Sequence, residues 1–134
     1  MNRKTESIGR QGEYLVAAFL SKYTPTVNVV PHGAEEDIVF KLNDRYYGCQ
    51  VKTKSKKEKV RNGWRFDLRR SGNTYDRYYR QSIDIFALVC LPKNKIYFLD
   101  AKYQKSLITL SDFQLDNLDE DLCFQATLQE LSQV

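Results

Sequence analysis

Cysteine and histidine are scarce in this chain, and each shortage removes a class of protein. The 134 residues include three cysteines and one histidine, His32. The cysteines are odd in number and widely spaced, which argues against a disulfide framework and against a zinc site built from a Cys-X-X-Cys pair. Cys49, Cys90 and Cys123 stand among apolar neighbours, so we expect buried thiols.

Long apolar runs are also missing. No stretch approaches the roughly 20 apolar residues of a membrane-spanning helix, and the polar residues after Met1 contain no signal-peptide core. A chain of 134 residues can bury about 68% of its unfolded surface in one domain. We therefore expect residues 1–134 to form a single soluble, cytoplasmic domain without a membrane partner.

Charge is distributed unevenly, although the net charge is only +4. Residues 52–80 contain eleven lysines and arginines against three acids, a local charge of +8, whereas residues 100–134 contain two lysines against seven acids, a local charge of −5. This separation suits a surface that holds a polyanion, with a solvated loop as the plain alternative. The predicted nucleic-acid contacts are Lys54, Lys56, Lys57, Lys59, Arg61, Arg65, Arg69, Arg70, Arg77 and Arg80.

Hydrophobic periodicity predicts the order of the elements. A helix is expected from Ser7, as its N-cap, to about Lys22, with Gly9 and Gly12 on its packed side allowing close approach of another element. Strands are expected at residues 26–30, 37–42, 46–53, 64–69, 83–91, 96–99 and 108–110, a helical turn within 71–80, and helices from 111 and over 126–132. This order predicts an α+β, α/β/α-like fold with a mixed central sheet flanked by helices.

Polar residues interrupt the predicted hairpin of strands 37–42 and 46–53. Side chains alternate between the faces of a strand, so Gln50 and Lys52 share one face. Pairing of the strands across the turn at residues 43–44 brings Asp37 close to both. An acid, an amide oxygen and an ammonium group are therefore predicted to converge.

This arrangement resembles the PD-(D/E)XK nuclease superfamily. Glu36-Asp37 stands where the family has Pro-Asp, and Gln50-Val51-Lys52 stands where it has acid-X-Lys. The Gln-X-Lys variant is most similar to the intron-encoded homing endonucleases of this fold from cyanobacteria, followed by archaeal-type Holliday junction resolvases. The resemblance implies a restriction-endonuclease-like core. It also implies that an acid of the first helix joins the metal site, and Glu13 in Gly-Arg-Gln-Gly-Glu looks like that acid.

The resemblance further implies catalytic roles for Asp37, Gln50, Lys52 and Glu13, with Asp37, Gln50 and Glu13 as ligands of Mg²⁺ or, alternatively, Mn²⁺. Phosphodiester hydrolysis needs an activated water and stabilisation of charge on phosphorus, and a hard divalent ion supplies both. Magnesium prefers oxygen ligands and keeps several waters, so few protein oxygens are needed. Lys52 would orient the attacking water or stabilise the phosphorane charge.

Two classes of function remain. The favoured one is a magnesium-dependent, site-specific homing-type endonuclease that cuts double-stranded DNA as a homodimer or homotetramer, because one site cuts one strand. A Holliday junction resolvase or a restriction-type nuclease is the runner-up among enzymes. A non-catalytic DNA-binding module of the same fold is the alternative. Lys52 favours the enzyme, since a binding protein has no chemical reason to direct a lysine at an acid.

Overall fold

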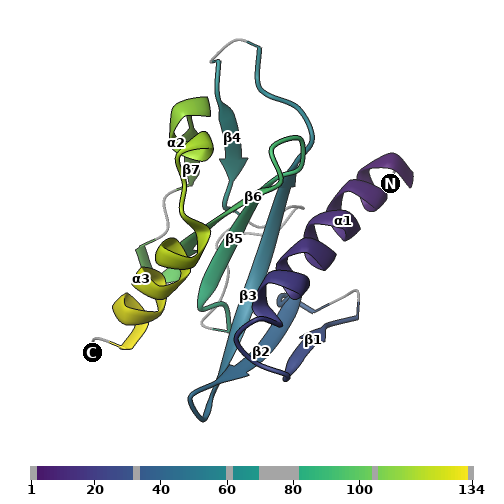
Figure 1. Cartoon of the computed structure of the whole chain (residues 1–134). Helices are drawn as coiled ribbons and strands as arrows, with labels where there is room; N and C mark the ends of the chain where they lie inside the picture. The colour runs from purple at the N-terminus through teal and green to yellow at the C-terminus, as the bar shows by residue number, and fades with distance from the viewer. Residues whose placement is uncertain (1–2, 32–33, 60–61, 70–81, 104–105, 133–134) are drawn as a thin grey trace.

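The computed structural model describes residues 3–31, 34–59, 62–69, 82–103 and 106–132. In chain order the elements are α1 (Arg3–Leu20), β1 (Val27–Val29), β2 (Ile38–Leu42), β3 (Arg45–Lys54), β4 (Trp64–Asp67), β5 (Ile85–Cys90), β6 (Lys95–Asp100), the 3-10 helix η1 (Ala101–Tyr103), β7 (Leu107–Leu110), α2 (Asp112–Asp116) and α3 (Glu120–Ser132). Five strands form a sheet in the order β1-β2-β3-β5-β6, and β4 pairs with β7 separately (Figure 1). None of the helices in these ranges is long and apolar enough to cross a membrane.

The hairpin of β2 and β3 turns at Asn43 and Asp44, whose φ angles are 53° and 63°. Positive φ at both positions is what a two-residue type I′ turn requires, and asparagine and aspartate tolerate it better than most residues. The antiparallel register pairs Ile38 with Cys49. Asp37, one residue earlier, therefore comes level with Gln50, which confirms the predicted hairpin.

Strand β5 is the centre of the sheet. All six of its residues are buried, and it pairs in parallel with β3 and antiparallel with β6. The larger hydrophobic cluster lies on the face of the sheet where α1 packs on β3 and α3 packs on β6, and Phe19 of α1 and Phe124 of α3 are in edge-to-face contact (Figure 1). The second cluster lies on the other face, beneath β4, β7 and α2. This arrangement confirms the predicted α+β class with a mixed, helix-flanked sheet.

Three predicted boundaries are wrong. Helix α1 begins at Arg3, so Ser7 lies inside it and its Oγ accepts a hydrogen bond from Gln11 Nε2 at 3.3 Å instead of capping the helix. Helix α3 begins at Glu120, where the carboxylate of Asp119 accepts from the backbone N–H of Leu122 at 3.1 Å. Strand β4 ends at Asp67, two residues before the predicted end of the strand at 64–69, and it pairs with β7 outside the main sheet.

Other expectations have mixed outcomes. The capping box at Ser111 is present, with both reciprocal hydrogen bonds to Gln114. Two of the cysteines are buried, as expected, and the third, Cys123, is half-buried. The predicted helical turn within 71–80 and the histidine His32 lie outside the described residues.

Candidate functional site

Asp37 directly precedes β2, beside the part of β3 that extends beyond the paired residues of β2. Its Oδ2 accepts a hydrogen bond from the backbone N–H of Val51 at 2.8 Å, and the Asp37 N–H donates to the carbonyl of Cys49 at 2.9 Å. The side chain thus replaces the missing strand partner of Val51. Because Val51 lies between Gln50 and Lys52, the structure brings the predicted acid against the backbone that carries the other two residues.

Gln50 is buried, with 9% of its surface exposed. Within the described part of the chain its Oε1 has no hydrogen-bond partner. An amide oxygen buried without a partner costs about 1–3 kcal/mol, so this position favours a bound cation or hydrogen-bond donor. With the Asp37 carboxylate nearby, it offers two oxygens of the kind that a hard divalent ion prefers. The donor set therefore fits a magnesium-type ion, although the described residues contain no cluster of three His, Cys, Asp or Glu side chains.

Lys52 is half-buried on the same face of β3 as Gln50. Its Nζ donates to the backbone carbonyl of Arg69 at 3.3 Å. Burial lowers the pKa of the Lys52 ammonium, while the carboxylates of Asp37 and Asp67 oppose that shift. The Lys52 ammonium therefore lies close enough to both carboxylates for their charges to act on it.

Sequence reasoning missed Asp67. The residue counted only as one of three acids in a basic segment, yet its carboxylate lies near Lys52 and is bound by Arg69 at 3.0 Å. The hydrogen bond from Arg69 is the main reason that the pKa of Asp67 falls to about 2. The Asp-X-Arg spacing directly after a strand is a local signal for such a turn. Its nearness to Lys52 has no local signal, because β4 packs on β3 through the tertiary fold.

Glu13 is half-buried on α1. The preceding residue, Gly12, lies so close to β3 that a Cβ there would come within 1.9 Å of Thr53 Oγ1. Thr53 points to the α1 face of the sheet, whereas Gln50 and Lys52 point to the opposite face. The structure thus places Glu13 beside β3, and its role as a metal ligand stays a prediction.

The predicted nucleic-acid contacts divide into three groups. Lys54, Lys56 and Lys59 are exposed, and no carboxylate of the described residues pairs with them. Three other cations are held by acids of the chain itself: Lys57 by Asp112, Arg65 by Glu58 and Arg69 by Asp67. The remaining four, Arg61, Arg70, Arg77 and Arg80, lie outside the described residues.

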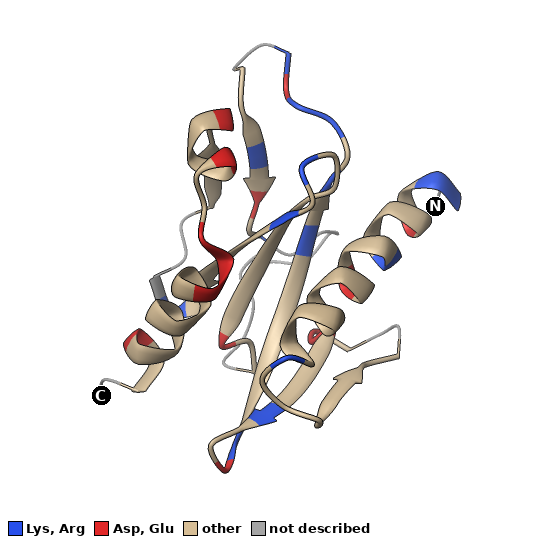
Figure 2. Cartoon of the chain, viewed as in Figure 1, with Lys and Arg blue, Asp and Glu red and all other residues tan. Residues whose placement is uncertain are grey.

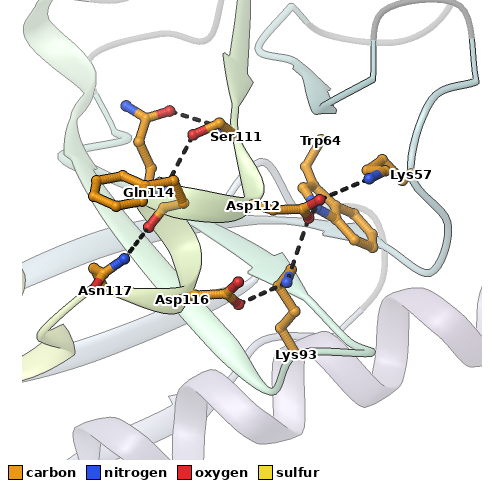
Figure 3. A network of polar contacts seen from close by, with 9 residues as sticks. Lys57, Trp64, Lys93, Ser111, Asp112, Gln114, Asp116 and Asn117 are labelled. Atoms are coloured by element: carbon orange, nitrogen blue, oxygen red, sulfur yellow. Dashed lines mark hydrogen bonds and ion pairs between the residues drawn. The ribbon is translucent and has the colours of Figure 1, made fainter.

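Asp112, the first residue of α2, collects contacts from distant parts of the chain (Figure 3). Its carboxylate accepts from Lys57 at 2.7 Å and from the indole N–H of Trp64 at 2.8 Å, and it pairs with Lys93 at 3.4 Å. Lys93 also contacts Asp116 at 2.6 Å. These contacts, above all that of Lys57, hold the pKa of Asp112 far below its usual range. The acidic C-terminal region thus neutralises part of the basic segment.

Figure 2 shows where the two kinds of charge lie. Basic residues follow the connection from β3 to β4 and mark the start of α1, while acidic residues are concentrated along α2 and α3. The exposed lysines of the connection directly follow the strand that carries Gln50 and Lys52. The candidate site therefore borders a basic surface.

Comparison with known proteins bears on the fold. No protein-family model matches the sequence, and no curated protein matches it. A solved structure described as that of a bacterial homing endonuclease, I-Ssp6803I, is similar to the chain with a TM-score of 0.67 at 19% identity, over 96% of this chain and 92% of that chain. A likeness at this identity concerns architecture, so the chain has an α+β fold similar to that of a bacterial homing endonuclease.

Proposed function

We propose that this chain is a metal-dependent endonuclease that hydrolyses phosphodiester bonds in duplex DNA. The observation that carries the proposal is the contact of the Asp37 carboxylate with the backbone N–H between Gln50 and Lys52. It brings together an acid, a buried amide oxygen and an ammonium group. The fold, similar to that of a bacterial homing endonuclease, supports an endonuclease of the homing type. The proposed membership in the PD-(D/E)XK superfamily rests on the resemblance of Gln50-Val51-Lys52 to its motif.

Asp37 and Gln50 would hold the ion, with Glu13 as the further ligand. When bound, a divalent ion such as Mg²⁺ would supply Lewis acidity and a more acidic water. The amide oxygen of Gln50 suits this role, since it lies buried without a partner in the described part of the chain. The Lys52 ammonium would orient the attacking water or stabilise negative charge that develops on the scissile phosphate.

The exposed lysines Lys54, Lys56 and Lys59 supply the surface for the DNA backbone. Phosphate contacts of this kind position a protein without reading the base sequence. One site cuts one strand, so a double-strand break requires at least a twofold-symmetric pair of copies. The proposed active form is accordingly a homodimer or homotetramer.

Nicking of supercoiled plasmid in the presence of magnesium tests the proposal. Asp37→Asn keeps an oxygen for the Val51 N–H but removes the charge, and Lys52→Met keeps the length of the side chain but removes the ammonium. Each should lower the cleavage rate by about a hundredfold or more, because each removes a group that acts on the reacting phosphate. Chelation of the metal should abolish cleavage in the unaltered protein.

Two matched controls separate chemistry from folding. Asp84 also accepts a backbone N–H at the head of a strand, from Gly48 at 2.9 Å, and Lys95 also donates to a backbone carbonyl, that of Leu118 at 3.0 Å. Asp84→Asn and Lys95→Met should therefore keep cleavage near the level of the unaltered protein. Near-normal cutting by Asp37→Asn or Lys52→Met would show that the site is misplaced. Comparison of long duplex DNA with four-way junctions would then separate a homing or restriction enzyme from a junction resolvase.

A further inference from the structure

The chain closes a tight turn directly after β4. Asp67 Oδ1 accepts hydrogen bonds from the backbone N–H and from Nε of Arg69, each at 3.0 Å, and Oδ2 accepts from Arg69 Nη2 at 3.0 Å. One carboxylate thus fixes both the backbone and the side chain of Arg69. The residue between them, Leu68, is buried and donates its N–H to the carbonyl of Ser106 at 3.0 Å, which anchors the turn to the chain before β7.

The backbone carbonyl of Arg69 accepts the hydrogen bond from Lys52 Nζ. A lysine side chain has many rotamers, so an ammonium that must meet one phosphate oxygen gains from being held beforehand. The turn at the end of β4 supplies this hydrogen bond to Lys52. Asp37 lies on the side of β3 that faces β2.

Stability alone does not explain the Asp67–Arg69 pair. The Asp67 side chain is 51% exposed, and exposed ion pairs contribute little to stability. Its neighbours Phe66 and Leu68, each 1% exposed, already anchor the segment in the second hydrophobic cluster. The three hydrogen bonds instead fix the backbone N–H and the side chain of Arg69, the residue whose carbonyl accepts from Lys52.

We propose that Asp67 is a positioning residue for the cleavage reaction: it fixes the Arg69 carbonyl, which in turn holds the Lys52 ammonium beside Asp37. This inference rests on the proposed nuclease function and adds to it a residue outside the Asp37, Gln50 and Lys52 set. Asp67 itself touches neither DNA nor metal in this role. Its hydrogen bonds reach Lys52 through Arg69, and its charge also acts on the ammonium directly.

The test uses Asp67→Ala, Asp67→Asn and the control Glu58→Gln. Glu58 belongs to the same basic segment and pairs with Arg65 at 3.6 Å, so its loss removes a comparable ion pair away from Lys52. With lysine labelled by ¹³C and ¹⁵N, and Lys52→Met for assignment, the two Hε protons of an ordered Lys52 should have separate shifts. We expect them to merge in Asp67→Ala, to stay partly separate in Asp67→Asn, which still accepts from the Arg69 N–H, and to be unchanged in Glu58→Gln.

Single-turnover cleavage and DNA affinity give the second readout. Asp67→Ala should lower the cleavage rate about tenfold at saturating protein, because a displaced catalytic group loses rate and not binding, and Asp67→Asn should recover part of it. DNA affinity should not fall, because neither substitution removes a cation. Unchanged Lys52 resonances in Asp67→Ala, or an equal loss of rate in Glu58→Gln, would overturn the inference. If the unaltered protein cuts no DNA, the proposed function fails, and the resonances alone still decide whether Asp67 orders Lys52.

Discussion

Gln50 places a neutral amide where the acid-X-Lys motif has a carboxylate. An amide oxygen attracts a cation through a partial charge, so the free protein should bind a divalent ion weakly, and phosphate oxygens of bound DNA should complete the ligand shell. Metal and DNA binding would then reinforce each other. Both expectations depend on one atom, the Oε1 of Gln50, which is buried and has no hydrogen-bond partner among the described residues.

Substitution of Gln50 tests this account. With Ca²⁺ as a non-cleaving ion, calorimetry should find weak binding to the free protein and much tighter binding to the DNA complex. Gln50→Leu should lose the tight binding, whereas Gln50→Glu should bind metal more strongly without DNA because it adds a full charge. Gln50→Leu should also be as stable as the unaltered protein or more so, because it removes an unpaired buried oxygen that costs about 1–3 kcal/mol.

The control for Gln50 is Gln129→Leu, a change of the same kind at an exposed position of α3. It should leave metal binding unaltered. If Gln50→Leu binds calcium in the DNA complex as the unaltered protein does, Gln50 is not a ligand, and the match to the nuclease motif loses its chemical basis.

The three central site residues could be predicted because they belong to one hairpin. A two-residue turn fixes the register of its strands, so the sequence distances alone bring Asp37 level with Gln50. Asp67 could not be found in the same way. Its place beside Lys52 depends on how β4 and β7 pack against the main sheet, and neither a turn nor a period in the sequence specifies that contact.

At the scale of elements, the approach of α1 to β3 depends on Gly12. A Cβ at this position would lie 1.9 Å from Thr53 Oγ1 and 2.9 Å from Thr53 Cβ, and the β-branched side chain of Thr53 has little freedom to move away. The sequence prediction gave the same role to Gly9, which is wrong, because a Cβ there meets nothing within 4 Å. A helical period identifies the packed face, but it does not tell which glycine touches the sheet.

These two glycines make a matched pair of substitutions. Gly12→Ala should lower the free energy of unfolding by about 1–3 kcal/mol, because the helix must shift away from β3. Gly9→Ala should raise it by about 0.5–1 kcal/mol, because alanine favours the helix and meets no neighbour. Urea unfolding of both variants measures the difference. Equal effects of the two changes would mean that α1 does not pack on β3 through Gly12.

The elements themselves were predictable where local chemistry specifies them. The Asn43-Asp44 turn, the capping box at Ser111 and the fully apolar run of β5 each have a signal within a few residues, and each is present. The pairing of β4 with β7 joins segments about forty residues apart, with β5 and β6 between them in the chain. Such a pairing depends on which apolar face of the main sheet the other elements leave exposed. That face becomes defined only when the whole chain has folded.

At the scale of the whole molecule, the basic segment and the acidic C-terminal region meet at Asp112. The total charge of +4 therefore does not describe the surface that DNA would contact. Lys57 lies 2.7 Å from Asp112 and is already neutralised, whereas Lys56 and Lys59 are exposed and have no acidic partner in the described ranges. The three lysines are close in sequence but differ in the charge that they offer to a phosphate.

This difference predicts unequal effects on DNA binding. Lys56→Gln and Lys59→Gln should each reduce the slope of log affinity against log salt concentration by about 0.9, the value for one lost phosphate contact. Lys57→Gln should reduce it less, because the ammonium it removes is bound to Asp112 and releases fewer counterions from DNA. Titrations of labelled duplex at several salt concentrations measure the three slopes. Equal slopes for all three variants would show that Lys57 leaves Asp112 when DNA binds, and unchanged slopes throughout would make the segment a solvated loop.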